Sequence, residues 1–417
     1  MNGFVDSAKV VSQDSSLEGI FKRILSQIPE NMDLLEAQQT IAAAVNALSA
    51  ADRLALRERF ESFLIHMREK EASDIEMGGV TANSHIWFRI QGKKMARAEL
   101  GIWPIGNTDI IAHSLLSEKQ RERLFKRRAV DFSYTMQRPQ GLWRWRATLY
   151  FDLGHLALNM RAIAGQIYPY AQLGFHSAIS RAFSLRYEKQ GLILITGITG
   201  SGKSTTLDSI IDANNRSVDG HIVIIGDPIE YIHNSRLCII RHREVGRDVN
   251  SFKDGAVQAL RQDPDIIVVG EMRDPDTIMT CLEIVDTGHK VFSTLHTGCA
   301  VETIDRIIAE CPGEEQERVR NRLADVLHVI ISQKLLPGIN GRLIMAKEVL
   351  LVTTPVRAAI RNRNVQEIYQ MISENNRQGM ITLEQDLVRL VTERLVDEKV
   401  ALDYANNKRR FQELLGN

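Results

Sequence analysis

The sequence contains little that would place the chain outside the cell or across a membrane. It has only four cysteines in 417 residues, and none forms a CxxC pair, so neither a structural zinc site nor a thioredoxin-like site is indicated. No apolar run approaches the roughly 18 residues that a membrane-spanning helix needs. Residues 1–16 lack a basic start followed by an apolar segment, so we expect no secretory signal. We therefore expect a cytosolic protein without disulfide bonds.

The chain also lacks an excess of charge of either sign. Lys and Arg number 52, Asp and Glu also number 52, and the formal net charge is therefore 0. This balance gives no support to a protein that coats nucleic acid or an anionic membrane. We see neither a basic groove nor a base-stacking aromatic cluster, which argues against a helicase. With 44% hydrophobic residues, the chain is long enough for two or three globular domains at about 100–200 residues each.

Helical periodicity extends from about Leu34 to Met67, whereas residues 1–17 are polar, and we interpret residues 1–68 as an N-terminal helical extension. Ser49, three residues before Asp52, has the spacing of a capping box that starts a second helix. The apolar residues of the two predicted helices recur at steps of three and four, which places them on single helix faces: Ile41, Val45, Leu48, Leu56, Phe60, Phe63, Leu64 and Met67.

A small α+β domain is predicted over residues 69–168. Residues 86–90 and 143–151 have the composition of strands and are bounded by Gly and Pro. The basic stretch 119–128 lies between them, and we expect a helix whose charges face solvent. Residues 169–185 are predicted to form a linker.

Strands and helices alternate over residues 186–350. Four short, uncharged runs rich in Ile and Val have the character of strands buried on both faces: 192–196, 222–225, 266–269 and 290–294. This rhythm predicts a parallel, doubly wound sheet of the α/β class. Residues 351–417 are predicted to form a helical C-terminal region, in which Thr382 and Gln385 start a helix as a capping box.

The strongest chemical signal directly follows the first of these strands. Residues 197–204, GITGSGKS, match the phosphate-binding pattern G-x-x-x-x-G-K-[ST] and precede a helical stretch, which is the context that a P-loop requires. Backbone N–H groups of such a loop surround phosphate oxygens, and the helix N-terminus adds its dipole. Lys203 is expected to reach the β- and γ-phosphates and Ser204 to bind Mg²⁺. The predicted ATP-binding residues are Gly197, Ile198, Thr199, Gly200, Ser201, Gly202, Lys203, Ser204 and Thr205.

Acidic residues follow two further strands. Glu271 comes after the strand 266–269 and is a Walker B candidate. It could order or deprotonate the attacking water, or bind Mg²⁺ through water. The alternative is a surface glutamate at a strand end. Asp227 and Glu230 follow the strand 222–225. Their spacing fits a catalytic crevice and a solvated proline turn equally well, and Asp227 is a further candidate for Mg²⁺ binding through water.

A histidine follows the fourth strand. His296 is well placed to sense a γ-phosphate, although a lone histidine more often has a structural role.

Taken together, these runs resemble the secretion ATPases of the type IV pilus and type II/IV secretion superfamily, and most closely the type IV pilus retraction ATPases. The resemblance extends over roughly residues 69–410. It includes the runs SDI at 73–75, GLILITGITGSGKSTT at 191–206, HIVIIGDPIEYIH at 221–233, REVG at 243–246, LRQDPDIIVVGEMRD at 260–274, TGHKVFSTLHT at 287–297, IDRII at 304–308 and GMITLEQDL at 379–387.

The resemblance implies a fold and an assembly. It implies a hexameric ring whose subunits carry a PAS-like domain and a RecA-like P-loop domain, with ATP between them. The runs correspond to the family's Walker A motif, Asp box, Walker B motif and His box. Arginines of the small domain reach the nucleotide in this family, and Arg146 and Arg161 match them. Guanidinium groups neutralise charge on a transferring phosphoryl group.

The sequence departs from the family at three places. Gly226 stands where a glutamate is usual before Asp227, and Leu153 stands where an arginine is frequent. The stretch 355–361 keeps the arginines of a helix typical of the retraction branch but only part of its pattern. The four-cysteine metal site of extension and type II secretion ATPases has no counterpart, which favours the retraction branch.

We therefore expect a motor ATPase that hydrolyses Mg-ATP and drives type IV pilus retraction at the inner membrane, as a cytoplasmic, peripheral homohexamer bound to a platform protein. Glu271 would position the water, Arg146 and Arg161 would close on the phosphates, and His296 and Glu230 would relay the state of the γ-phosphate. The alternatives are an ATPase of a type II or type IVB secretion or conjugation system, and a low-turnover ATP-binding accessory subunit, which Gly226 and Leu153 motivate.

Overall fold

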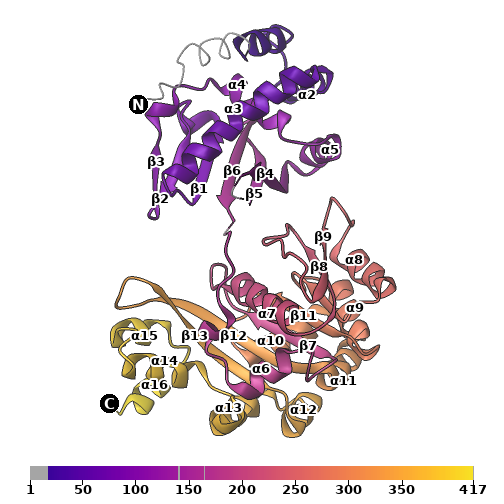
Figure 1. Ribbon diagram of the computed structural model, residues 1–417, viewed down its shortest axis with the longest axis vertical. Coiled ribbons are helices and arrows are strands. Elements are labelled where there is room, and N and C mark those ends of the chain that lie inside the picture. The colour runs from indigo at the N-terminus through magenta and orange to yellow at the C-terminus, as the bar shows by residue number, and fades with distance from the viewer. Residues whose placement is uncertain (1–16, 140, 164, 417) are drawn as a thin grey trace. The chain divides into compact units, whose positions relative to one another are not determined.

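The computed structural model describes residues 17–139, 141–163 and 165–416, and it divides into two compact units, Met1–Gly165 and Gln166–Asn417. Figure 1 shows the helices and strands of both. Among the described residues, no helix combines the length and the apolarity that crossing a membrane demands. The four cysteines, all described, are free thiols: Cys238, Cys281, Cys299 and Cys311.

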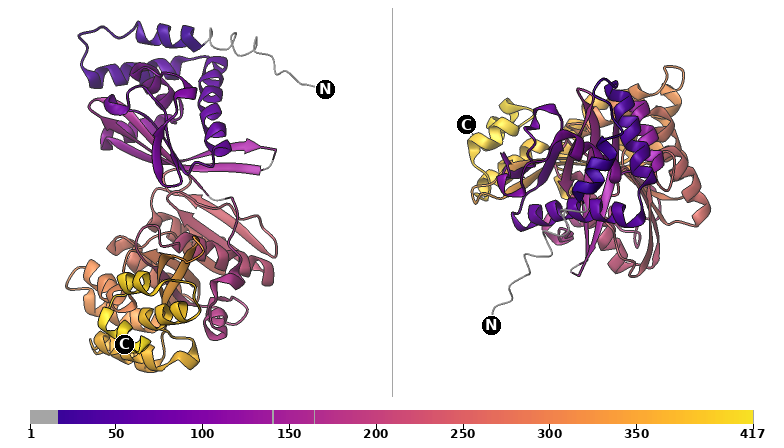
Figure 2. Two further views of the ribbon diagram at one scale, coloured as in Figure 1. Left: turned by 90° about the vertical axis from the view of Figure 1, so that its left-hand side faces the viewer. Right: turned by 90° about the horizontal axis from the view of Figure 1, so that it is seen from above.

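The first unit is a six-stranded antiparallel sheet covered by helices, with strand order β3-β2-β1-β6-β5-β4. Its β4–β5 hairpin projects from the unit (Figure 2). The sequence predicted two of these strands, at 86–90 and 143–151, and missed the others, of which two are the hairpin neighbours of the strand at 143–151. The elements are α2 (Leu34–Ala47), α3 (Ala50–Glu69), β1 (Asp74–Gly78), β2 (Trp87–Ile90), β3 (Lys93–Ala96), α4 (Ile105–Ser114), α5 (Glu118–Arg127), β4 (Ala129–Arg138), β5 (Gly141–Asp152) and β6 (His155–Ala162).

The N-terminal helices are part of this unit's core. On α3, Leu56, Phe60 and Phe63 are buried in one hydrophobic cluster with residues of the sheet such as Trp145. The amphipathic stripe of α3 has to bury its apolar face, and the inner face of the sheet provides the partner surface. The segment that the sequence sets apart as an extension therefore folds together with the α+β region.

Two local predictions in this region need refinement. Ser49 caps α3 by accepting from Asp52 N, but the Asp52 carboxylate bonds Arg23 at 2.7 Å. The basic helix α5 was expected to expose its charges, yet Arg121 is buried and donates to the carbonyl oxygens of His113 and Leu116 at 2.7 Å each. Arg121 thus donates to one carbonyl group in the last turn of α4 and to another just beyond the helix.

The second unit confirms the predicted parallel sheet. Four parallel strands, β7 (Gly191–Thr196), β8 (Gly220–Gly226), β10 (Ile266–Val269) and β11 (Lys290–Leu295), form its centre, in a seven-stranded sheet of order β13-β12-β7-β11-β10-β8-β9. The prediction did not include the outer strands β9 (Cys238–Glu244), β12 (Leu327–Pro337) and β13 (Leu343–Leu351), of which β13 is antiparallel to β12. The helices around the sheet are α7 (Lys203–Ser217), α8 (Phe252–Ala259), α9 (Pro275–Asp286), α10 (Ala300–Glu310) and α11 (Gln316–Val326).

The segment predicted as a linker is folded. It contains α6 (Ser177–Phe183), which buries Ile179 and Phe183 beneath the sheet, and Lys347 Nζ donates to Leu173 O at 3.0 Å. Its apolar residues find a partner surface that their sequence did not reveal. The C-terminal helices are α12 (Thr354–Arg361), α13 (Ile368–Glu374), α14 (Leu383–Thr392), α15 (Glu398–Tyr404) and α16 (Lys408–Leu415). The predicted capping box of Thr382 and Gln385 is present at the start of α14.

Candidate functional site

The candidate site lies where the central parallel strands of the second unit end. The loop after β7 is the P-loop. Glu271 follows β10, His296 follows β11, and Asp227 and Glu230 follow β8. Because β7, β11, β10 and β8 are parallel neighbours, their carboxyl ends share one edge of the sheet. This edge is where ligands bind in open α/β sheets.

Three glycines of the P-loop, Gly197, Gly200 and Gly202, have positive φ angles, a conformation that favours glycine. Gly197 has φ +146°, and a Cβ there would lie 2.4 Å from the carbonyl oxygen of Gln333. Gly202, with φ +86°, directly precedes α7. The loop therefore turns tightly into the N-terminus of a 15-residue helix, where backbone N–H groups and the helix dipole favour a phosphate.

A side chain from β12 supports this loop. Gln333, which is 1% exposed, donates from Nε2 to Ser201 O at 2.7 Å. Its position follows from the pairing of β12 with β7, in which Ser332 lies opposite Thr196. Sequence reasoning missed Gln333 because it lies 132 residues beyond Ser201 and carries no motif. A buried Ser201 Oγ has no protein partner, so the loop retains an unsatisfied polar atom that suits a polar ligand.

Lys203, His296 and Glu271 form a continuous line of contacts across three neighbouring strands. Lys203 Nζ lies 3.5 Å from His296 Nδ1, and His296 Nε2 lies 3.4 Å from Glu271 Oε1. Lys203 also donates to Gly197 O at 2.7 Å. An ammonium group only donates and a carboxylate only accepts, so a neutral histidine with its proton on Nε2 satisfies both neighbours.

The electrostatics of the line agree with this protonation. Burial, followed by the positive charge of Lys203, lowers the pKa of His296 below its ordinary value, although the Glu271 carboxylate opposes the shift. Burial also lowers the pKa of Lys203, while the negative charges of Glu271 and Glu230 oppose that shift. The site therefore keeps His296 neutral between a cation and an anion.

Two arginines that sequence reasoning missed contact Glu271 and His296. Arg273 Nη2 pairs with Glu271 Oε2 at 2.7 Å, and Arg306 Nη1 donates to His296 O at 3.1 Å. Both arginines line a cavity of about 370 Å³ beside Glu271 and His296. Arg273 belongs to the same run as Glu271, so the sequence did contain a signal for it.

Asp227 and Glu230 follow β8 at the same edge and are both exposed. Gly226 ends β8 in close packing, because a Cβ there would lie 2.9 Å from Ile229 Cδ1 and 3.2 Å from Pro228 O. A glutamate, which is usual at this position in the family that the sequence resembles, would require these neighbours to shift.

Arg146 and Arg161 belong to the other unit, where they lie directly opposite each other on β5 and β6. Opposite residues of an antiparallel pair share one face of the sheet, so the two guanidinium groups emerge side by side. Arg161 Nε pairs with Asp74 at 2.8 Å. Leu153 occupies the turn between β5 and β6, at the far end of the strands from this pair.

The donor set at the sheet edge suits Mg²⁺ bound together with a nucleotide. Ser204 offers a hydroxyl in the first turn of α7, and Glu271 and Asp227 offer carboxylates at the ends of β10 and β8. Among the described residues, no three His, Cys, Asp or Glu side chains gather closely enough to hold a metal alone. Oxygen ligands completed by substrate phosphates and water are the usual environment of Mg²⁺, and these residues fit it.

Comparison with known proteins extends these observations. Residues 154–340 match the family model described as type II/IV secretion system protein. The type IV pilus retraction ATPase PilT of Pseudomonas aeruginosa is 36% identical over 72% of this chain and 86% of its own length. A twitching motility protein of Neisseria gonorrhoeae is 34% identical over 77% of this chain and 84% of its own length.

A solved structure shows the same likeness. The crystal structure of the pilus retraction motor PilT with bound ADP has a TM-score of 0.74 and 37% identity, and it covers 84% of this chain and 98% of that chain. The predicted fold class, a RecA-like P-loop domain preceded by an α+β domain, is thereby confirmed.

Proposed function

Since the chain belongs to the family of type IV pilus retraction ATPases and is an ATP hydrolase, we propose that it is a motor that hydrolyses Mg-ATP and drives disassembly of a type IV pilus during twitching motility. The observation that carries this proposal is the line of contacts from Lys203 through His296 to Glu271. It joins the phosphate-binding loop to the residue that would activate water.

The P-loop holds the triphosphate in this proposal. Backbone N–H groups of residues 197–204 surround the phosphates, and Lys203 neutralises charge on the β- and γ-phosphates. To reach them, its ammonium group gives up the carbonyl oxygens of Gly197 and Ile198, to which it donates at 2.7 and 3.2 Å. Ser204, with Glu271 and Asp227 through water, would hold Mg²⁺, which neutralises phosphate charge when bound.

Glu271 orients the attacking water. Its carboxylate lies at the end of β10 and is only 17% exposed, with His296 on one oxygen and Arg273 on the other. Phosphoryl transfer depends mainly on positioning and charge neutralisation, so a fixed carboxylate beside the P-loop is the required element. Arg146 and Arg161 add positive charge to the phosphates, and His296 and Glu230 report the state of the γ-phosphate.

The work output would come from an assembly of identical copies. We propose a homohexamer in the cytoplasm, peripheral at the inner membrane and bound to a platform protein of the pilus machinery. Nucleotide-dependent rigid-body motion is the standard way in which such cycles move a partner. The balanced net charge of 0 suits a protein partner better than a nucleic acid.

Phosphate release from purified protein under assembling conditions tests the chemistry. Lys203→Ala should abolish turnover, and Glu271→Gln should reduce kcat by about 10²–10⁴-fold with ATP binding retained. Lys253→Ala is the matched control, because Lys253 is a surface lysine paired with Asp276 at 3.1 Å. Turnover of the unmodified chain equal to that of Lys203→Ala would instead indicate the accessory subunit without catalysis.

The biological role needs a separate measurement. A strain lacking this chain should lose twitching and accumulate surface pili, and the unmodified chain but not Lys203→Ala should restore retraction. Restoration of effector secretion or conjugation without any effect on pili would overturn the assignment to pilus retraction. The solution mass with an ATP analogue reports the assembly.

A further inference from the structure

A row of charged side chains crosses the sheet of the first unit. The strand registers place Arg89 on β2 opposite Asp74 on β1, Asp74 opposite Arg161 on β6, and Arg161 opposite Arg146 on β5. Directly opposite residues lie on the same face of an antiparallel sheet. Three arginines and one aspartate therefore share a single row on the face opposite the hydrophobic core.

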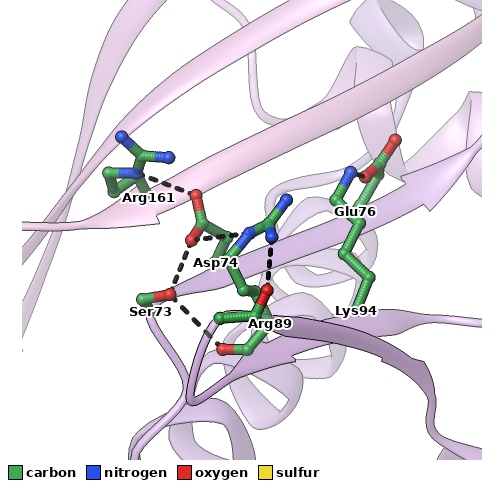
Figure 3. Close-up of polar contacts among 7 residues, drawn as sticks. Ser73, Asp74, Glu76, Arg89, Lys94 and Arg161 are labelled. Atoms are coloured by element: carbon green, nitrogen blue, oxygen red, sulfur yellow. Dashed lines mark hydrogen bonds and ion pairs between the residues drawn. The ribbon is translucent and has the colours of Figure 1, made fainter. Parts of the chain in front are cut away.

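Asp74 is the centre of this row (Figure 3). It is 4% exposed, and its Oδ1 accepts from Arg161 Nε at 2.8 Å. Its Oδ2 accepts from Ser73 Oγ at 2.6 Å and lies 3.6 Å from Arg89 Nε. A buried carboxylate is tolerated when its oxygens are paired and hydrogen-bonded in this way, so the geometry ties Asp74 to both neighbouring strands.

The two arginines on either side of Asp74 differ in how their guanidinium nitrogens are engaged. Arg89 also donates from Nη1 to Gly92 O at 2.7 Å, so both of its ends are engaged. Arg161 is held through Nε, and its side chain remains 66% exposed. A guanidinium group that is bound at Nε still presents its two terminal nitrogens as a flat pair of donors, the arrangement that matches phosphate oxygens.

The charge of the row also favours an anion. Arg89, Arg161 and Arg146 carry three positive charges against the single negative charge of Asp74. Lys94 on β3 lies opposite Arg89, but Glu76 forms an ion pair with it. Asp74 thus screens repulsion between the neighbouring guanidinium groups without cancelling the net positive charge.

We propose that Asp74 is a positioning residue for nucleotide hydrolysis, which fixes the Arg161 guanidinium through Nε so that its terminal nitrogens face outward to meet phosphate oxygens. This inference rests on the proposed function, in which Arg161 contacts the phosphates. Asp74 itself touches no substrate and acts through Arg161 alone.

A double-mutant cycle tests the proposal on the full chain. Asp74→Asn removes the charge at nearly constant size, and we expect kcat to fall about tenfold, because misplacing a group that neutralises the transition state costs rate. In the Arg161→Ala background the same substitution should change kcat and the affinity for a fluorescent ATP analogue by less than about twofold. Glu76→Gln is the matched control, since Glu76 lies two residues away on the same strand and face and also pairs with a cation.

The outcomes separate this inference from the proposed function. If Arg161→Ala lowers kcat but Asp74→Asn does not, or if the two losses multiply, the positioning role is refuted while the function stands. If Arg161→Ala leaves both kcat and affinity unchanged, the assignment of Arg161 to the phosphates fails, and the inference fails with it. Solution mass and thermal unfolding are compared for every variant, so that lost assembly is recognised.

A milder variant covers the case in which Asp74→Asn does not fold. Ser73 is exposed, and Ser73→Ala removes one donor to the Asp74 carboxylate. We expect a fall in kcat of about twofold that disappears when Arg161 is already alanine. A Ser73→Ala protein with unchanged kcat, or a loss that persists in the Arg161→Ala background, would overturn the proposal.

Discussion

Lys203 Nζ lies 3.5 Å from His296 Nδ1, so the lysine of the P-loop faces the histidine that directly follows the strand β11. His296 in turn reaches Glu271 through Nε2 at 3.4 Å. A histidine between the phosphate-binding lysine and the proposed water-positioning carboxylate can respond to a change at either end. The two contacts of His296 therefore connect the phosphate-binding lysine to the proposed water-positioning carboxylate.

The acid side of the pH–rate profile tests this link. Burial and Lys203 lower the pKa of His296, so it stays neutral at pH 7 and gains a proton only below its ordinary value of 6.5. A protonated ring would place a cation against Lys203, so we expect kcat to fall below about pH 6.5. In His296→Gln this acid limb should shift or vanish, with kcat at pH 7 reduced about tenfold.

A histidine outside the site serves as the control for this experiment. His221 lies at the start of β8, at the opposite edge of the sheet. His221→Gln should leave the acid limb in place. An identical acid limb in the unmodified chain and in His296→Gln would contradict the proposed role of His296.

Gln333 should matter for nucleotide affinity although it lies on β12. Its side chain donates to Ser201 O at 2.7 Å in a fully buried position. Gln333→Met keeps the length of the side chain but loses the donor, and one lost buried hydrogen bond costs about 1 kcal/mol. We expect the Kd for an ATP analogue to rise by about five- to tenfold, measured by fluorescence titration.

An exposed glutamine provides the comparison for Gln333. Gln370 on α13 is exposed and donates from Nε2 to Glu374 at 2.5 Å. Gln370→Met should bind nucleotide like the unmodified chain. Equal affinities for the Gln333→Met and Gln370→Met proteins would show that the P-loop does not depend on this contact.

The turn between β5 and β6 stores backbone strain that can be removed. Leu153 has φ +50° and is 71% exposed, so a left-handed conformation is occupied by a leucine without compensating burial. Asparagine adopts this conformation more readily, and the penalty for other residues is about 1–2 kcal/mol. Leu153→Asn should raise the free energy of unfolding of the first unit by about 1 kcal/mol in urea titrations.

The tryptophans make this measurement specific. All four lie in the first unit, so their fluorescence follows its unfolding: Trp87, Trp103, Trp143 and Trp145. Leu142 is an exposed leucine on β5 whose φ is not positive, and Leu142→Asn should give no gain in stability. Equal changes in both variants would mean that the conformation of Leu153 carries no penalty.

Acid should destabilise the first unit through His113. Burial and then the positive charge of Arg121 lower the pKa of this histidine to about 3. The unfolded chain binds a proton there below about pH 6.5 and the folded chain does not, so stability is lost as the pH falls through 6.5. Between pH 7 and pH 5 the loss should be about 2 kcal/mol by urea titration, and His113→Gln should abolish it.

The neighbouring His155 should act in the opposite direction. Its hydrogen bond with the Asp109 carboxylate, at 2.8 Å, raises its pKa above the ordinary value. Its stabilising contribution is therefore present at low pH and is lost as the pH rises through the folded pKa. His155→Gln should steepen the acid loss, and a flatter profile would argue against this assignment.

Local patterns in the sequence determined the four central strands of the second unit, the helical stretches between them and the position of the P-loop. An uninterrupted apolar run followed by GITGSGKS predicts a strand and a P-loop within about 15 residues. This is possible because the burial pattern of a strand and the conformational freedom of glycine are local properties. The capping box at Thr382 was also predicted from local sequence. The residues that follow the strands also indicated Lys203, His296 and Glu271, which come together, and the family resemblance added Arg146 and Arg161.

Contacts between distant parts of the chain were decided by tertiary structure alone. Gln333 reaches Ser201 across 132 residues, and Asp74 reaches Arg161 across 87, in both cases because strand pairing sets which residues face each other. A register shift of one residue would send each side chain to the other face of its sheet, and no local pattern specifies that register. The burial of α3 against the sheet likewise depended on which surface its apolar stripe met.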